Sequence, residues 1–381
     1  MRTIVSSASG FALALFLPQA AVSATISLPS SLVDPGVQVE LLATGIQFGE
    51  GPAISPDGTF YFVQSNIPCI SMIRAGSNVV QTFQNPSNKA NGMIFRPDGS
   101  LVVCEQGRIA RIDTATRQSV NLITDYTGHA LDLCNDLTIT GNGTIYFTNP
   151  NWNTPITQNN DVYMLSPRGT LTQLSRNMAQ PNGVEYVAEL NGLYLNIFGQ
   201  NKVVRYALTG DGALGAAKDF AAVNQPDGLE LDSKGNVYVA SYGDARIVVF
   251  DSTGVSLGSI SLRETGEDFN VTNCSFGWGT DTYLYITATT RLFRVKMKVE
   301  GRKRSPAAAA AFEGSRLRSA PQNGSTIPYG RHFCRWRAFS ALTASILDPQ
   351  GRFVYRGSRP EVPGIYIMET SPLPSKEEAQ R

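Results

Sequence analysis

The sequence predicts an all-β protein, a six-bladed β-propeller, and two properties of its residue pattern carry the prediction. Val, Ile, Thr and Tyr gather in short runs between turns that contain Gly or Pro, which favours strands over helices. A unit of one polar residue, a few apolar positions, a glycine turn and a β-rich run also occurs six times. The first residues of successive units are separated by 41, 44, 47, 45 and 46 residues. Such a period holds about four short strands, the size of a propeller blade, whereas a two-layer sandwich needs no such regularity.

The repeats divide into hairpins. In the first repeat, residues 52–55 are predicted to form a strand, Pro56-Asp57-Gly58 a turn and residues 59–64 the next strand. The stretches "CISMIRAG" and "NVVQTFQ" supply two more strands. The six repeats begin with "EGPAISPDGTFYFV" at Glu50, "NGMIFRPDGSLVVC" at Asn91, "NDLTITGNGTIYFT" at Asn135, "NGVEYVAELNGLYLN" at Asn182, "DGLELDSKGNVYVAS" at Asp227 and "NCSFGWGTDTYLYITA" at Asn273.

The last repeat is one strand short, because its pattern stops near Val299 after "YLYITAT" and "RLFRVKMKV". An unassigned strand, "VQVELLAT" at residues 37–44, precedes the first repeat. We expect this N-terminal strand to complete the sixth blade, which closes the ring and protects two open sheet edges. The propeller is then expected to span residues 25–300.

The two ends of the chain differ from the repeats. Residues 1–24 combine Arg2, a short apolar run and the small-residue site Val22-Ser23-Ala24, which predicts a secretory signal peptide and a secreted, extracellular protein. An N-terminal membrane anchor is the alternative, although the apolar run is shorter than the roughly 20 residues that span a bilayer. Residues 301–381 are basic and break the repeat, so we expect a mostly disordered, non-propeller tail with a loose hairpin in "FVYRGSRPEVPGIYIM". A gene-end artefact would give the same pattern.

Composition excludes several classes of protein. Residues 25–300 carry more Asp and Glu than Lys and Arg, which argues against nucleic acid as a partner. No other segment is apolar enough for a membrane span. The five cysteines form no CxxC pair and the chain has only two histidines, so neither a disulfide scaffold nor a zinc site is expected.

The chemistry is expected at the first residue of each repeat, where every side chain carries oxygen. If the first strand of each blade is innermost, these six side chains converge at the mouth of the central channel. Carboxylate and amide oxygens without Cys or His suit a hard divalent cation such as Ca²⁺, which takes about six to eight oxygen ligands. The carboxylates of Glu50 and Asp227 would neutralise it, and without metal their crowding would raise at least one pKa. The alternative is that Asn-Gly and Asp-Gly are ordinary turn dipeptides.

The repeats resemble the SMP-30/gluconolactonase/regucalcin family of six-bladed, calcium-dependent lactonases, which is related to diisopropyl-fluorophosphatase. The resemblance covers roughly residues 38–299 and rests on "EGP" at Glu50, "ND" followed by "GTIYFTNP", "QPNG", "QPDG" and "TNCSFG". It implies metal ligands at Glu50, Asn182 and Asp227, with Asn135 as a fourth ligand or a substrate-binding group.

Two residues depart from the pattern of that family. Leu133 stands where regucalcin-type members carry Arg, and Asn149 stands where the family has the Asp of "FTDP". Both changes weaken gluconolactone as the specific substrate and leave the expected metal site intact.

The resemblance implies metal-assisted hydrolysis of a small-molecule lactone or related ester, with the metal polarising the carbonyl. Asp227 is the candidate general base for the attacking water. Two alternatives remain open: an organophosphate hydrolase on the same site, and a non-catalytic propeller that binds a partner and holds a structural calcium.

Other residues near the expected channel mouth are weaker candidates. His129, Trp152 and Asn91 are predicted to contact substrate, although a surface loop, simple packing and a blade turn, respectively, would also explain them. Cys134 and Cys274 flank two of the repeat asparagines, and we expect inert buried thiols rather than nucleophiles.

Overall fold

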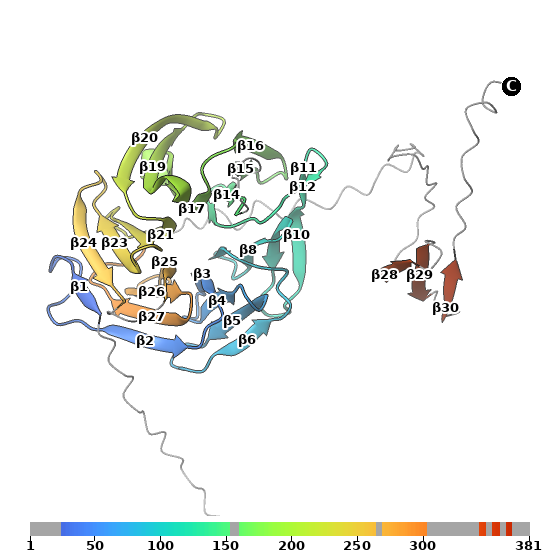
Figure 1. Ribbon diagram of the computed structural model, residues 1–381, viewed down its shortest axis with the longest axis horizontal. Coiled ribbons are helices and arrows are strands. Elements are labelled where there is room, and N and C mark those ends of the chain that lie inside the picture. Colours follow the sequence, from blue (N-terminus) through green and yellow to red (C-terminus); the bar gives the residue numbers. More distant parts are fainter. Residues whose placement is uncertain are drawn as a thin grey trace, which may run out of the picture. The chain divides into compact units, whose positions relative to one another are not determined.

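The computed structural model describes residues 24–152, 160–263, 269–302, 343–347, 353–358 and 363–367. The chain divides into two compact units, Met1–Ser315 and Arg316–Arg381. Within the described ranges the regular elements are strands, apart from two short 3-10 helices, η1 (Ala188–Leu190) and η2 (Phe198–Gln200). In the first unit the strands form six antiparallel blades around a centre (Figure 1), five of four strands and one of five, so the predicted six-bladed propeller is confirmed.

The first three blades follow the chain without interruption. Blade 1 consists of β3 (Gly49–Ile54), β4 (Phe60–Gln64), β5 (Cys69–Ile73) and β6 (Gln81–Gln84). Blade 2 consists of β7 (Met93–Phe95), β8 (Leu101–Glu105), β9 (Arg108–Ile112) and β10 (Ser119–Ile123). After a small hairpin of β11 (Asp125–Tyr126) and β12 (His129–Ala130), blade 3 consists of β13 (Leu137–Ile139), β14 (Ile145–Asn149), β15 (Asp161–Leu165) and β16 (Leu171–Ser175).

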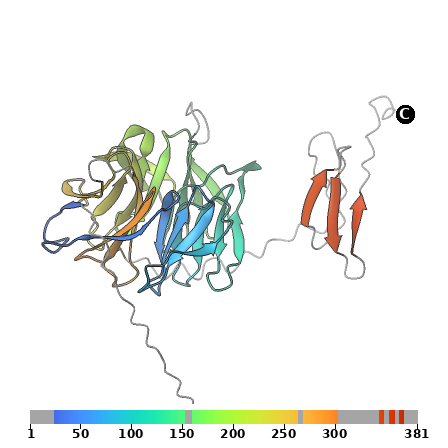
Figure 2. The ribbon, with the colours of Figure 1, turned by 60° about the horizontal axis from the view of Figure 1, so that its bottom comes forward.

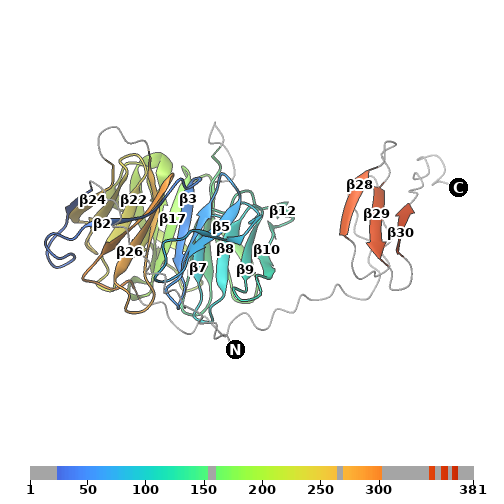
Figure 3. The ribbon, with the colours of Figure 1, turned by 90° about the horizontal axis from the view of Figure 1, so that it is seen from below.

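The other three blades repeat this order. Blade 4 consists of β17 (Pro181–Val187), β18 (Gly192–Ile197), β19 (Lys202–Leu208) and β20 (Leu214–Ala222). Blade 5 consists of β21 (Pro226–Leu231), β22 (Val237–Ser241), β23 (Arg246–Phe250) and β24 (Ser256–Ser261). Blade 6 takes β25 (Val271–Phe276), β26 (Tyr283–Ala288) and β27 (Arg291–Lys296) from the end of the propeller. Figure 3 shows the ring from the side, with the strands of the blades running along its axis.

The N-terminal segment closes the ring. Strand β2 (Val39–Thr44) pairs antiparallel with β27, from Val39 opposite Val295 to Thr44 opposite Arg291, and becomes the fourth strand of blade 6. This confirms the closing strand expected at residues 37–44. The sequence did not predict β1 (Thr25–Ser27), which pairs with β24 and adds a fifth strand to blade 5 (Figure 1).

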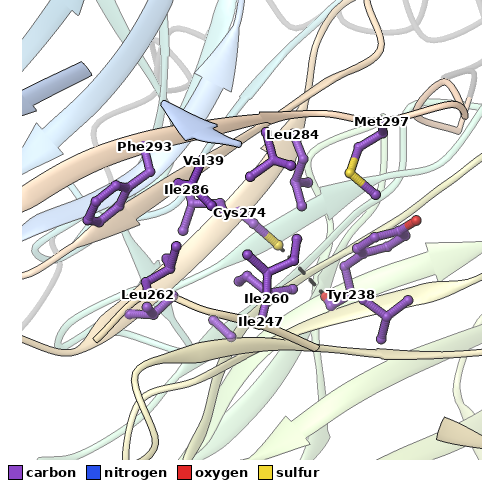
Figure 4. Packing of buried hydrophobic residues seen from close by; sticks show 14 of the residues in the cluster. Val39, Tyr238, Ile247, Ile260, Leu262, Cys274, Leu284, Ile286, Phe293 and Met297 are labelled. Atoms are coloured by element: carbon purple, nitrogen blue, oxygen red, sulfur yellow. Dashed lines mark hydrogen bonds between the residues drawn. The ribbon is translucent and has the colours of Figure 1, made fainter. Parts of the chain in front are cut away.

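Burial explains why the runs are so apolar. The inner and second strands of most blades are buried along their whole length, as in β4, β8 and β22, because neighbouring blades pack on both of their faces. Outer strands such as β10 and β20 are partly exposed and carry more polar residues. Between blades 5 and 6 the packed side chains include Val39, Ile260, Leu284 and Phe293 (Figure 4). Val39 comes from β2, so the closing strand contributes to the core that it seals.

The described part of the C-terminal unit is a three-stranded antiparallel sheet of β28 (Thr343–Leu347), β29 (Phe353–Ser358) and β30 (Pro363–Ile367), visible in Figure 2. Strands β29 and β30 coincide with the hairpin expected in this segment, and β28 adds a third strand that the expectation of a mostly disordered tail did not include. The predicted signal peptide at residues 1–24 lies almost wholly outside the described residues. In the part of the chain that the structure describes, no helix is long and apolar enough to cross a membrane.

Candidate active site

The first residue of every repeat lies at the start of an innermost strand. Glu50, Asn182, Asp227 and Asn273 belong to β3, β17, β21 and β25, and Asn91 and Asn135 stand two residues before the starts of β7 and β13. Because all six strands run in the same direction around the channel, these residues gather at one end of it. We call these six residues the channel-mouth ring.

Glycines after the ring residues allow neighbouring blades to approach closely. A Cβ on Gly51 would overlap the backbone carbonyl of Asn91, and a Cβ on Gly228 would overlap the side chain of Asn273. The Glu50-Gly51 and Asp227-Gly228 pairs therefore serve inter-blade packing. The alternative interpretation as hairpin turn dipeptides is wrong at Asn182 and Asp227, because Gly183 and Gly228 lie within strands β17 and β21.

Buried side chains of one blade also hold the ring backbone of the next. Thr148 Oγ1 on β14 donates a hydrogen bond of 2.7 Å to the carbonyl oxygen of Asn182. Asn196 Nδ2 on β18 donates one of 2.6 Å to the carbonyl oxygen of Asp227. Both donors belong to residues that are fully buried, so the positions of Asn182 and Asp227 are fixed by the protein interior.

The backbone around the ring is irregular in a repeated way. The strand register shifts just after Glu50, between Pro181 and Val184, and between Pro226 and Leu229, and such β-bulges re-aim the side chains beside them. A left-handed residue other than Gly occurs two positions before four ring residues, with φ angles of 63°, 52°, 57° and 47° at Phe48, Lys89, Gln180 and Gln225. Backbone strain of this kind gathers at functional sites.

The two ring carboxylates form a buried pair. Glu50 is 5% exposed and Asp227 is 6% exposed, and within the described ranges no Lys or Arg forms an ion pair with either. Burial raises the pKa of Glu50 to about 8, against a backbone hydrogen bond from Gly51 that lowers it. Burial and the nearby charge of Glu50 raise the pKa of Asp227 well above its usual range, although Asn182 donates a hydrogen bond to it. Two buried acids without a positive partner identify a place where a cation would be stabilised.

A third acid, Asp136, follows the ring residue Asn135 and is half-buried. Burial raises the pKa of Asp136 to about 7, and the charges of Glu185 and Glu230 raise it further. Asp136, Glu185 and Glu230 line a channel space of about 20 Å³, close to the size of one water molecule. The channel below the ring is therefore narrow and lined by acidic side chains.

The segment that follows β27 pairs with the backbone around the end of β21, at the opposite end of the channel. The backbone N–H of Arg302 donates a hydrogen bond of 3.0 Å to the carbonyl of Leu231, and its guanidinium pairs with Glu185. A cavity of about 310 Å³ opens beside this segment, lined by residues that include Ile54, Trp278 and Arg302. Ile54 ends β3, the strand near whose start Glu50 stands, so this cavity lies away from the channel-mouth ring.

The ring fits a hard divalent cation by its donor chemistry. It offers the carboxylates of Glu50 and Asp227 together with amide side chains, which are the oxygen ligands that calcium takes. Asn135, Asn182 and Asn273 are 6%, 3% and 7% exposed, so their amides are also withdrawn from bulk water. Among the described residues, no group of three or more His, Cys, Asp and Glu side chains is placed to hold a metal, which leaves the mixed carboxylate-amide ring as the candidate.

The structure separates the other candidates. Asn91 belongs to the ring and is half-buried. Trp152 is 39% exposed and its ring contacts Phe198. His129 lies on the β11–β12 hairpin, which is anchored through Tyr126 to Tyr163 on the third strand of blade 3. The hairpin thus packs toward the outside of that blade, and a role of His129 in substrate binding stays a prediction.

The cysteines are placed as expected. Cys134 and Cys274 are buried, and burial raises the pKa of both thiols. Cys274 lies in the core between blades 5 and 6, where its Sγ hydrogen-bonds to the carbonyl of Tyr238 (Figure 4). Such thiols are poor nucleophiles.

Sequence reasoning missed three acids of the channel. Asp136 directly follows Asn135, and the pair stands in the sequence as "ND". Glu185 and Glu230 each stand three residues after a ring residue, within the strand runs "VEYV" and "LELD". The signal was a charged residue at the same repeat position in two blades whose strands are otherwise apolar.

The fold and site define a six-bladed propeller with a buried carboxylate-amide ring at its channel mouth. Residues 37–290 match the family described as the SMP-30/Gluconolactonase/LRE-like region. The match covers more than half of the chain, and the chain therefore belongs to this family.

Individual relatives agree with this family. The chain is 27% identical to a gluconolactonase of Zymomonas mobilis over 306 residues, which cover 71% of this chain and 84% of that protein. The structure of a gluconolactonase from Xanthomonas campestris is similar with a TM-score of 0.64 and 23% identity, over 73% of this chain and 96% of that one. The calcium-binding protein regucalcin from Agrobacterium tumefaciens is similar with a TM-score of 0.62 and 17% identity, over 71% of this chain and 97% of that one. At these identities the two structures support the fold alone.

Proposed function

We propose that this protein is a divalent-metal-dependent hydrolase that opens a lactone, with its active site at the channel-mouth ring. The observation that carries the proposal is the buried pair Glu50 and Asp227, which has amide neighbours and, in the described chain, no basic partner. A family whose members include a gluconolactonase supports the reaction class.

In this proposal Glu50, Asn182 and Asp227 hold the metal, and Asn135 either completes the ligand set or binds substrate. A divalent cation bound there, calcium by its preference for oxygen ligands, supplies Lewis acidity that polarises the substrate carbonyl. Asn196 and Thr148 keep the backbone of two of these residues in place through their inter-blade hydrogen bonds.

The chain itself supplies the proton transfer. Asp227 accepts a proton from water while the water oxygen bonds to the lactone carbonyl carbon. The C–O bond within the lactone ring of the substrate then breaks. The leaving alkoxide takes that proton from Asp227, and the product is a hydroxy acid. The narrow channel below the ring, with about 20 Å³ of free space, admits no substrate, so the substrate approaches from the mouth.

Hydrolysis of a lactone panel, with and without the chelator EDTA, tests the proposal in wild type and in Asp227→Asn. We expect EDTA to abolish turnover, excess Ca²⁺ to restore it, and the variant to lose about 100-fold or more in kcat, the contribution of a general base. The matched control is Asp219→Asn, an exposed carboxylate on β20 paired only with Lys202 among described residues, which should turn over normally. Turnover that is indifferent to both EDTA and Asp227→Asn would contradict the mechanism.

Two other results would replace the proposal. Hydrolysis of phosphotriesters without hydrolysis of lactones would indicate the organophosphate alternative. Calcium binding without turnover of either substrate class would indicate a binding propeller with a structural ion. We further propose that the protein is secreted, which the predicted signal peptide at residues 1–24 supports; N-terminal sequencing of the mature protein tests this.

A further inference from the structure

Three aromatic side chains from three consecutive blades form a row. Trp152 follows β14 in blade 3, Phe198 follows β18 in blade 4, and Tyr242 follows β22 in blade 5. The ring centroids of Trp152 and Phe198 are 5.4 Å apart and their planes meet at 87°, and those of Phe198 and Tyr242 are 6.0 Å apart at 61°. These are edge-to-face contacts of the kind that aromatic pairs prefer. We call these three residues the aromatic row.

Backbone hydrogen bonds place two members of the row beside the channel-mouth ring. The N–H of Phe198 donates to the carbonyl of Gln180 over 3.0 Å, two residues before Asn182. The N–H of Tyr242 donates to the carbonyl of Gln225 over 3.1 Å, two residues before Asp227. The two aromatics therefore occupy equivalent positions in blades 4 and 5. Each is anchored to the backbone that leads into a proposed metal ligand.

Trp152 extends the row over the third blade. It stands three residues after Asn149, the last residue of β14. That end of β14 lies beside the channel-mouth ring, because the carbonyl of Thr148 accepts a hydrogen bond of 2.9 Å from the N–H of the ring residue Asn135. The aromatic row thus follows one arc of the channel mouth, next to Asn135, Asn182 and Asp227.

The row remains accessible. Trp152 is 39% exposed, and Phe198 and Tyr242 are half-buried. An exposed indole next to two half-buried aromatic rings leaves apolar surface in water, beside a buried polar ring that is expected to do chemistry. Apolar walls with a few convergent polar groups are typical of sites for small molecules.

We propose that the aromatic row binds an apolar substituent of the substrate and selects lactones that carry an aryl or alkyl group over polyhydroxylated lactones. This inference rests on the proposed function, because it assigns the reacting carbonyl to the channel-mouth ring. The substrate then lies with its carbonyl at Glu50 and Asp227 and its substituent across the arc of blades 3 to 5.

The chemistry of the row explains the direction of this selectivity. Its surface offers aromatic faces and edges, and its polar atoms are limited to the Trp152 indole N–H and the Tyr242 hydroxyl. A polyhydroxylated ring placed there would lose water from several hydroxyls without regaining hydrogen bonds, which costs affinity. An aryl or alkyl group instead gains burial and aromatic contact.

Paired substrates test the selectivity. kcat/KM is measured for δ-valerolactone, a phenyl-substituted δ-lactone and glucono-δ-lactone, in wild type, Phe198→Ala and Trp152→Ala. We expect the phenyl-substituted lactone to be preferred by wild type. In each variant, the ratio of kcat/KM for the phenyl-substituted lactone to kcat/KM for δ-valerolactone should fall by about tenfold. This is the effect of removing an apolar contact from a specificity pocket. Trp152→Ala removes an exposed side chain, so it stays informative if Phe198→Ala does not fold.

A binding measurement separates this inference from the proposed function. Isothermal titration calorimetry with a phenyl-substituted δ-lactam, which is not hydrolysed, reports on the row whether or not the protein turns over lactones. We expect tighter binding of the phenyl lactam than of unsubstituted δ-valerolactam, and loss of that difference in Trp152→Ala. The matched control is Trp278→Ala, whose indole lines the cavity at the far end of the channel and should leave the difference intact.

These measurements distinguish failure of the aromatic row from failure of the proposed function. Turnover of lactones with equal preference for all three, unchanged in Phe198→Ala and Trp152→Ala, would overturn the role of the row and leave the proposed function standing. Absence of turnover with a retained, Trp152-dependent preference for the phenyl lactam would overturn the proposed function and support the row as a binding surface. A preference for glucono-δ-lactone, or equal binding of both lactams, would overturn the inference.

Discussion

Replacing Glu50 with Gln is expected to stabilise the metal-free protein and to remove its response to calcium. Glu50 is buried, and its pKa in the folded chain is about 8, compared with 4.5 for an ordinary Glu. The unfolded chain therefore releases the Glu50 proton at lower pH than the folded chain does. The metal-free folded state is at its most stable, as far as Glu50 is concerned, below about pH 4.5, and it loses stability as the pH rises toward about 8.

The size of the effect follows from the pKa difference. One pKa unit corresponds to about 1.4 kcal/mol, so raising the pH from about 5 to about 8 costs the metal-free protein about 3 kcal/mol through Glu50. Glu50→Gln removes this titration, and the free energy of unfolding of the variant should exceed that of wild type by about that amount near pH 8 in EDTA. Saturating Ca²⁺ should reverse the order, because a ligand of the folded state stabilises only the protein that binds it.

Urea unfolding followed by far-UV circular dichroism measures both effects, near pH 5 and near pH 8, in EDTA and in Ca²⁺. The difference between wild type and Glu50→Gln isolates this residue from the other titrating groups, and Asp219→Asn serves as the control for removal of an exposed charge. Equal stability of metal-free wild type at the two pH values would refute the reasoning. Calcium stabilisation of Glu50→Gln as large as that of wild type would refute it as well.

Three further predictions concern the framework of the site. Gly228→Ala should lower the free energy of unfolding by about 3 kcal/mol or more, because its Cβ would overlap the next ring residue, whereas Gly210→Ala meets nothing within 4 Å and should be tolerated; chemical denaturation distinguishes them. Arg302→Met should lower the free energy of unfolding by about 3 kcal/mol, because Glu185 would be left buried without its partner. Adding Glu185→Gln to that variant should restore much of the lost stability, and a double-mutant cycle measures the coupling between the two residues. A chain that starts at residue 37 should fold, whereas one that starts at residue 46 lacks β2 (Val39–Thr44) and should aggregate through the open edge of β27, as size-exclusion chromatography would show.

The sequence was sufficient for the architecture because a propeller repeats its constraints. Each blade fills the same sector of a closed ring, so the period and the missing strand of the last repeat predicted both the blade number and the closing strand at residues 37–44. β1 (Thr25–Ser27) was not predicted, because three residues carry no periodicity and their partner strand β24 is more than 200 residues away. Its pairing depends on the tertiary structure alone.

The site was predictable in part, and the physical reasons differ from residue to residue. Glu50 and Asp227 stand in the same repeat phase, and phase determines position around the axis. Glu230 interrupts an apolar run. From the sequence alone, such a channel-facing acid looks the same as a solvent-facing residue in a strand of alternating polarity. Phe198 and Tyr242 follow strands in different blades, and their contact depends on the radial packing of those blades, which no local pattern contains.

The central claim is that Glu50, Asn182 and Asp227 together hold a divalent cation at the channel mouth. Anomalous diffraction from crystals of the propeller grown with Ca²⁺, and then with Mn²⁺ in its place, tests this claim most directly. We predict one anomalous peak per chain in contact with the carboxylates of Glu50 and Asp227, and its loss in Asp227→Asn. A peak at another place, or none at the ring when both ions are in excess, would contradict the account.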